Sequence, residues 1–153
     1  MISHSDILFC NKEEAFAVGQ HMSNELEIPD HVERDEQAIL SRIASKLANY
    51  AKTKRFPGRT VIITRSEQPV IVSRIVLKDG SDIPSLETFT VAVESVSKSK
   101  ICDSNGCGDT FVGGYLAKLV SFPETSCLRK NQIEAAVKAG NLMAGEVLQR
   151  YGC

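Results

Sequence analysis

The chain has 153 residues, of which 42% are hydrophobic and 24% are charged, and its formal net charge is −1. This size matches one ordinary domain that can bury a core of its own. The nearly balanced charge gives no electrostatic reason to expect nucleic acid or an acidic membrane surface as a partner. No apolar run reaches the ~20 residues that span a bilayer, so we expect a soluble protein with small-molecule partners.

The N-terminus and the cysteines indicate a reducing compartment. The opening MISHSDILFC lacks the basic start, long apolar stretch and cleavage site of a signal peptide. We therefore expect the cytoplasm, with the nucleus as an alternative. The cysteine count is odd and no CxxC pair occurs, which argues against a disulfide framework and a zinc ribbon. The cysteines are Cys10, Cys102, Cys107, Cys127 and Cys153.

The first 65 residues alternate between strand-like and helix-like patterns. Short β-branched or apolar runs at 7–10 and 61–64 predict strands, the second covered on both faces. Helices are predicted from about 12 to 26 and from about 35 to 51. In the second helix, apolar residues recur every four positions. They are Ile39, Ile43 and Leu47.

The second half begins with two more predicted strands and ends with two helices. The strands are predicted at 70–77 and 89–96, joined by a turn that includes Asp79-Gly80. The helices are predicted from about 109 to 120 and from about 131 to 150. Without a repeat or linker, the order of elements predicts one α/β unit with strands covered by helices.

A glycine-rich loop precedes the first of these two helices and fits none of the common ligand loops. No Lys follows Gly106 or Gly108, which excludes a Walker A loop, and Phe111 occupies the third glycine position of a dinucleotide fingerprint. An EF-hand fails because Cys107 and Gly114 replace its oxygen ligands. The remaining interpretation is that the loop leads directly into the N-terminus of a helix.

Such a loop can bind an anion. The backbone N–H groups of Gly106, Cys107 and Gly108 can converge on one point, where the helix dipole adds positive charge. Asp109 then stands at the rim of this cradle. The alternative is that Asp109 is only the N-cap of the helix, a common position for Asp.

The loop also carries a family resemblance. Residues 103–114, DSNGCGDTFVGG, resemble the signature D-T-x-G-A-G-D-x-F of the ribokinase-like (PfkB) carbohydrate and nucleoside kinases. Asn before the first Gly, followed by F-V-G-G-[FY]-L, is more similar to the adenosine kinase branch than to ribokinases or fructokinases. The resemblance implies a ribokinase-like, three-layer, Rossmann-type sheet with helices on both faces.

The resemblance further implies the reaction ATP + adenosine → ADP + AMP, a step of purine salvage. By this match Asp109 is the base that activates the ribose 5′-hydroxyl, and Gly106, Cys107 and Gly108 form the anion hole. Asn105 would lie near the nucleoside or its phosphate acceptor. A kinase of the same family acting on another sugar or nucleoside stays open as an alternative.

Near the N-terminus, Asn11 and Glu14 match the N-x-x-E element of the family. The match implies that they organise Mg²⁺ and phosphate through water, which suits a cation that dehydrates reluctantly. The alternative makes Asn11 a helix N-cap and Glu14 its capping-box partner. Both roles are compatible.

Two more segments match the nucleotide side of the family. The strand ending at Thr64 leads into the nucleotide loop, which here contains Arg65. Gly140 and Asn141 match the helix beside the adenine. The alternatives are a solvated surface position for Arg65, close helix packing for Gly140 and a solvated polar face for Asn141.

The chain also departs from the family. Residues 1–153 resemble only a C-terminal nucleotide-binding portion, so we expect the N-terminal half and the lid domain to be absent. Without them the chain would be a catalytically incompetent nucleotide-binding fragment, the second functional hypothesis. An exposed sheet edge would favour self-association. Cys107 replaces the usual Ala, and a thiol at a helix N-terminus can be unusually reactive.

Overall fold

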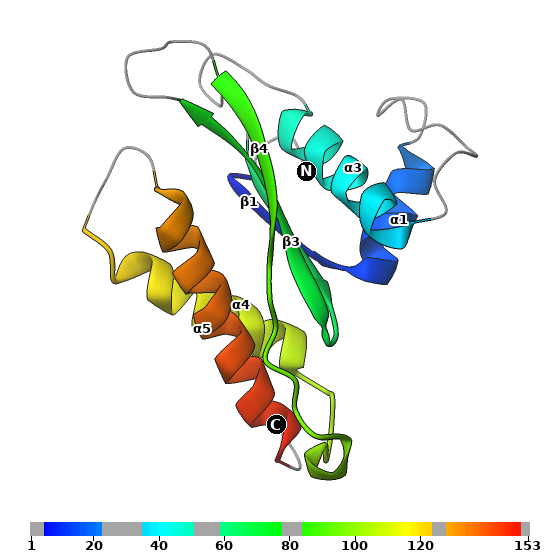
Figure 1. Cartoon of the computed structure of the whole chain (residues 1–153), viewed down its shortest axis with the longest axis vertical. Coiled ribbons are helices and arrows are strands. Elements are labelled where there is room, and N and C mark those ends of the chain that lie inside the picture. The colour runs from blue at the N-terminus through cyan, green and yellow to red at the C-terminus, as the bar shows by residue number, and fades with distance from the viewer. Residues whose placement is uncertain (1–4, 23–34, 51–58, 78–83, 124–127, 151–153) are drawn as a thin grey trace. The chain divides into compact units, whose positions relative to one another are not determined.

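The computed structural model describes residues 5–22, 35–50, 59–77, 84–123 and 128–150. In chain order the elements are β1 (Ile7–Asn11), α1 (Lys12–His21), α3 (Glu36–Asn49), β2 (Thr60–Arg65), β3 (Gln68–Leu77), β4 (Pro84–Val91), η2 (Lys98–Lys100), α4 (Cys107–Val120) and α5 (Lys130–Leu148). They form two compact units, residues 1–65 with 70–90 and residues 66–69 with 91–153 (Figure 1).

The sheet has the strand order β1-β2-β3-β4. β1 and β2 are parallel, in a register that pairs Ile7 with Thr60 and Asn11 with Thr64. Contacts from Ser73 to Thr88 and from Arg74 to Glu87 show that β3 and β4 are antiparallel, because partner numbers fall as residue numbers rise. The parallel pair therefore brings the ends of β1 and β2 side by side.

The core of the first unit lies between this sheet and two helices. α1 and α3 lie on the same side of the strands (Figure 1). The predicted period of α3 holds in part. Ile43 and Leu47 are buried, whereas Ile39 is only partly buried. Leu40 is buried beside them, with Val61 and Ile63 of β2. Burying such side chains is worth about 1.5–3 kcal/mol each, which holds α3 against β2.

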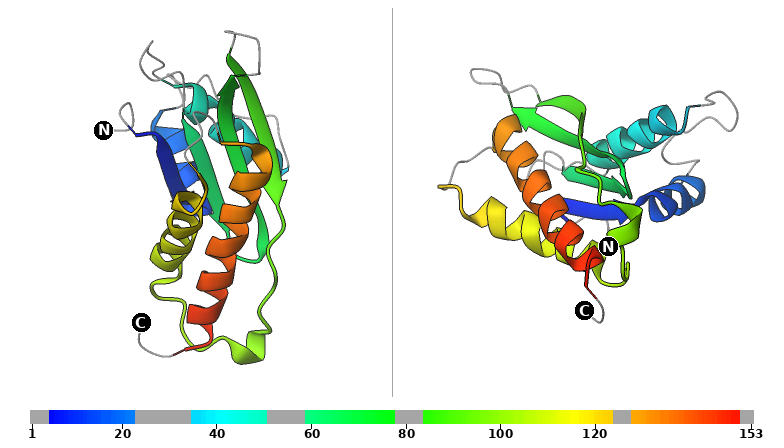
Figure 2. Two further views of the ribbon diagram at one scale, coloured as in Figure 1. Left: turned by 90° about the vertical axis from the view of Figure 1, so that its left-hand side faces the viewer. Right: turned by 60° about the horizontal axis from the view of Figure 1, so that its bottom comes forward.

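In the second unit, α4 and α5 pack against each other (Figure 2). Two glycines allow this approach. A Cβ at Gly114 would lie 2.9 Å from the Ala139 carbonyl oxygen, and a Cβ at Gly140 would lie 2.7 Å from that of Phe111. The N–H of Cys102 also donates to the Leu148 carbonyl (2.7 Å), which ties the segment before the glycine loop to the end of α5.

Most predicted elements, and the α/β class, are confirmed, with one strand wrongly placed. The strand predicted at 89–96 is β4, Pro84–Val91. Pairing with β3 decides its position, because the Ser85 hydroxyl reaches the Val76 carbonyl. Pro84 is compatible with the first residue of an outer strand, where its missing N–H costs nothing. Residues 92–97 have no regular structure.

The helix boundaries also differ from the prediction in places. α1 ends at His21 instead of near residue 26, α4 begins at Cys107 instead of Asp109, and the remaining bounds agree within about two residues. The predicted turn at Asp79-Gly80, and the residues Cys127 and Cys153, lie outside the described ranges. None of the helices in the described ranges has the length and apolar content that crossing a bilayer requires.

Candidate functional site

The glycine loop is shaped by one left-handed residue. Gly106 has φ 74° and ψ −5° and is the N-cap of α4. A side chain would be strained in this conformation. Before it, the Asp103 carboxylate accepts the N–H of Asn105 (3.0 Å). After it, the N–H and hydroxyl of Thr110 both donate to the Gly106 carbonyl, at 2.9 and 2.8 Å. The loop is therefore held on both sides.

Asp109 is not the N-cap of α4, so the capping interpretation is wrong. It lies in the first turn of the helix, and its side chain is exposed. The cap position belongs to Gly106, which has no side chain to offer. Asp109 therefore stands beside the helix N-terminus, as the proposed base would.

The backbone around Asp109 is that of a helix N-terminus. The first N–H groups of a helix have no carbonyl partner within that helix. That of Cys107 donates to the Ser104 carbonyl over a long 3.4 Å. A Cβ placed on Gly108 would meet nothing within 4 Å, so the turn leaves space for a ligand atom. Backbone dipoles there would stabilise negative charge.

Gly140 confirms the packing interpretation. Its missing side chain lets α5 approach Phe111, where an added Cβ would lie 2.9 Å from the ring. Phe111 itself is only 3% exposed and lies in the helix that carries Asp109. Gly140 therefore helps to position the loop, whatever else it contacts.

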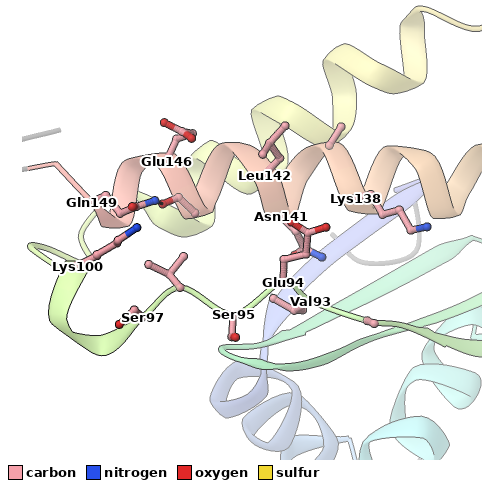
Figure 3. Close-up of a pocket in the computed structure, with 14 residues that line it drawn as sticks. Val93, Glu94, Ser95, Ser97, Lys100, Lys138, Asn141, Leu142, Glu146 and Gln149 are labelled. Carbon is pink, nitrogen blue, oxygen red and sulfur yellow. Dashed lines mark hydrogen bonds between the residues drawn. The ribbon is translucent and has the colours of Figure 1, made fainter.

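Asn141 lines a cleft in the second unit, so the prediction of a solvated polar face is wrong. The cleft has a volume of about 730 Å³ and lies between residues 92–97 and α5 (Figure 3). The Nδ2 atom of Asn141 is buried and has no hydrogen-bond partner in the part of the chain that the structure describes. A buried amide without a hydrogen-bond partner destabilises the folded protein.

In the first unit, Asn11 and Glu14 form the capping box of α1. The Asn11 side-chain oxygen accepts the Glu14 N–H at 2.8 Å, and the Glu14 carboxylate accepts the Asn11 N–H at 2.9 Å. Asn11 also pairs in register with Thr64. The sheet thus brings three of the predicted residues together where β1 and β2 end, the edge at which α/β sheets bind ligands.

Arg65 is buried, so the prediction of a solvated surface arginine is wrong. It is 6% exposed, and its Nη2 donates to the Gln37 side-chain oxygen at 3.1 Å. A buried guanidinium needs such acceptors because desolvation is expensive. The contact joins the end of β2 to the start of α3. Sequence reasoning missed Gln37, since only the packing of α3 brings it to this strand end.

The residues at this strand end fit a magnesium ion held through water. The Glu14 carboxylate is exposed and uses one oxygen in the capping box, so its other oxygen remains available to a hydrated cation. In the parts of the chain that the structure describes, no three His, Cys, Asp or Glu side chains gather as a direct metal site would require. A water-mediated arrangement agrees with both observations.

The described cysteines are free of disulfides. Burial raises the pKa of the Cys10 thiol to about 12, with a smaller contribution from the Glu14 carboxylate. Its Sγ lies 3.9 Å from the Ile62 carbonyl oxygen. The Cys10 thiol is therefore protonated at neutral pH. Cys107 is half-buried at the start of α4.

Comparison with known proteins places this geometry in context. The model of the pfkB family carbohydrate kinases matches residues 1–153. Adenosine kinase 2 of Arabidopsis thaliana is 33% identical over 118 residues, which are 77% of this chain and 29% of that protein. These matches confirm the resemblance carried by residues 103–114.

Solved structures give the same result. The crystal structure of Anopheles gambiae adenosine kinase in complex with P1,P4-di(adenosine-5) tetraphosphate matches with a TM-score of 0.70 and 28% identity, over 99% of this chain and 37% of that one. Adenosine kinase from Schistosoma mansoni in complex with 2-fluoroadenosine matches with a TM-score of 0.69 and 25% identity, over 99% and 36%. The chain thus spans 29–37% of the length of these relatives.

Proposed function

The chain belongs to the pfkB family of carbohydrate kinases, and on that premise we propose that it carries the catalytic loop and nucleotide side of an adenosine kinase. The observation that supports this most directly is the loop itself. A left-handed Gly106 opens α4, and the exposed Asp109 follows in the first turn. An anion cradle beside a carboxylate is what transfer of a phosphoryl group to an alcohol requires.

In the proposed reaction Asp109 orients the ribose 5′-hydroxyl of adenosine and accepts its proton. The hydroxyl oxygen bonds to the γ-phosphorus of ATP as the bond from that phosphorus to the β–γ bridging oxygen breaks, which yields AMP and ADP. The N–H groups of Gly106, Cys107 and Gly108 stabilise the charge that develops on the transferred group. Asn105, held by the Asp103 turn, lies on the acceptor side.

The nucleotide-binding role is proposed for Thr64, Arg65, Gly140 and Asn141. Thr64 and Arg65 lie at the end of β2, a position suited to the phosphates. Gly140 and Asn141 lie on α5, beside the cleft. Asn11 and Glu14 would hold hydrated Mg²⁺, whose charge would neutralise phosphate oxygens. Small-molecule substrates, ATP and adenosine, are the proposed partners.

A second candidate is a nucleotide-binding portion without turnover. The chain spans 29% of the length of Adenosine kinase 2. A kinase also needs residues that hold the acceptor and exclude water from the reaction. The two candidates differ in whether this chain binds adenosine productively, and they share the binding of ATP.

A coupled assay of ADP formation with Mg·ATP and adenosine tests both candidates. The first candidate predicts turnover that falls at least about a hundredfold in Asp109→Asn, because the isosteric amide cannot accept the proton. Glu13→Gln, which changes an exposed first-turn carboxylate of α1, is the matched control and should keep full activity. No turnover, with ATP still raising the melting temperature, would support the second candidate. Absence of both effects would contradict the proposed function.

A further inference from the structure

Three contacts fix the first turn of α3 in the first unit. The Asp35 carboxylate caps the helix by accepting the Gln37 N–H at 2.9 Å. The Glu36 carboxylate accepts from Nζ of Lys12, the first residue of α1, at 3.3 Å. The Gln37 side-chain oxygen accepts from Nη2 of Arg65, the last residue of β2, at 3.1 Å. The turn therefore links the start of α1 to the end of β2.

The contact made by Gln37 is the one of the three that holds a buried charge. Lys12 and Glu36 are 36% and 47% exposed, and ion pairs between exposed side chains contribute little to stability. Arg65 is only 6% exposed. A hydrogen bond to a charged group is stronger than one between neutral groups, and burial strengthens it further. Gln37 can therefore fix the direction of the Arg65 guanidinium.

A second buried arginine of the same unit has a different kind of partner. Arg74 is 7% exposed, and its Nε donates to the Glu87 carboxylate at 2.9 Å. The charge of Glu87 opposes that of Arg74. Gln37 offers Arg65 an acceptor oxygen but brings no charge. Gln37 therefore holds the Arg65 guanidinium without reducing its attraction for an anion.

We propose that Gln37 is a positioning residue that acts on the phosphates of ATP through the guanidinium of Arg65. This inference rests on the proposed function, which assigns Arg65 to the nucleotide. Arg65 directly follows Thr64, the register partner of Asn11. Its charge thus belongs to the strand end where the phosphates would bind. A guanidinium that is already held in one direction loses less side-chain freedom when the ligand binds.

Two substitutions separate the hydrogen bond of Gln37 from its lack of charge. Gln37→Met keeps the length of the side chain but has no acceptor oxygen. Its melting temperature should fall by about 2–4 °C, and it should bind Mg·ATP roughly tenfold more weakly. Gln37→Glu keeps an acceptor and adds a negative charge, which suits both Arg65 and the helix N-terminus, so its melting temperature should not fall. It should still bind Mg·ATP several-fold more weakly, because the added charge repels the phosphates.

Thermal shift and calorimetric titration with Mg·ATP measure these two quantities on the chain. The matched control is Gln132→Met, because Gln132 Oε1 accepts the Arg129 N–H at 2.7 Å at the start of α5. Gln132 is not among the described residues that line the cleft. This control should lose a similar amount of stability and bind Mg·ATP like wild type.

A double-mutant cycle with Arg65→Met tests the route of the effect. If Gln37 acts through Arg65, Gln37→Met should weaken Mg·ATP binding in the wild-type background and no further in Arg65→Met. A residue that only stabilised the fold would weaken binding in both backgrounds. It would also give Gln37→Glu, which keeps its stability, the affinity of wild type.

The outcomes separate the inference from the function on which it rests. If wild type does not bind ATP, the proposed function fails, and the inference fails with it. If wild type binds ATP but Gln37→Met or Arg65→Met binds it equally well, the inference is overturned and ATP binding stands. Equal weakening by Gln37→Met with and without Arg65, or wild-type affinity in Gln37→Glu, would overturn it in the same way.

Discussion

At the scale of single residues, Asp109 carries the greatest weight because its position separates two interpretations. A capping Asp would contribute its side chain to the helix start, and its loss would cost about 1 kcal/mol. Here Gly106 occupies the cap and Asp109 is exposed one turn into α4. Its contribution to stability is then limited to the helix dipole, about 0.3–1 kcal/mol.

We therefore expect Asp109→Asn to lower the free energy of unfolding by less than about 1 kcal/mol, although it abolishes the proposed chemistry. Urea denaturation followed by circular dichroism measures the change. Asp35→Ala is a reference, since Asp35 does cap a helix and accepts the Gln37 N–H at 2.9 Å. Its loss should cost about 1 kcal/mol. If Asp109→Asn lowered the free energy of unfolding by well over about 1 kcal/mol, Asp109 would contribute more to the stability of the fold than its exposed position predicts.

Cys10 provides a prediction about pH. Its folded pKa of about 12 lies above the ordinary value of 9.0, so the unfolded chain releases this proton first. The stabilising contribution is complete below pH 9 and is lost as the pH rises toward 12. The free energy of unfolding, measured by denaturation, should fall between pH 8 and pH 11. This fall should be smaller in Cys10→Ala than in the wild type. Equal falls in both proteins would contradict it.

At the scale of elements, the α4–α5 contact depends on Gly140, because the packing leaves no room for a side chain at this position. Gly140→Ala would place a Cβ 2.7 Å from the Phe111 carbonyl oxygen. We expect a loss of about 1–3 kcal/mol, because backbone must move. Gly113→Ala is the matched control: it lies in α4 with nothing within 4 Å of its Cβ, so it should gain up to about 1 kcal/mol. Thermal denaturation measures both, and equal effects would refute the packing argument.

The start of α1 tests whether Asn11 has a role beyond its cap. Ser caps helices about as well as Asn, so Asn11→Ser should leave the melting temperature nearly unchanged. If the Asn11 amide also organises hydrated Mg²⁺, the same variant should bind Mg·ATP several-fold more weakly. Calorimetric titration with and without Mg²⁺ measures this, and unchanged Mg²⁺ dependence would leave Asn11 as a cap alone.

At the scale of the whole molecule, the outer strands of the sheet determine whether the protein associates with itself. β1 and β4 are the outer strands of the order β1-β2-β3-β4, and unpaired strand edges promote association. We expect the measured mass to rise with protein concentration in size-exclusion chromatography with light scattering. A constant monomer mass across a hundredfold range of concentration would contradict self-association through an edge.

The sequence by itself determined most of the elements and the glycine loop before α4. Helix periodicity, β-branched runs and the residues 103–114 are local patterns, and local patterns survive without knowledge of the fold. Hence α3, β2 and the family were predicted correctly, and the capping box at Asn11 and Glu14 was among the stated alternatives. Close helix packing at Gly140 was likewise among the stated alternatives.

The tertiary structure decided whatever depends on residues distant in the chain. β4 lies earlier than predicted because β3 selects its partner by register, which no local window contains. Arg65 is buried because α3 brings Gln37 to it. Asn141 faces a cleft because the 92–97 segment lies along α5. A polar residue in a sequence is expected to be exposed to solvent. Only the packing of the folded chain shows which polar side chains are buried and therefore need a hydrogen-bond partner.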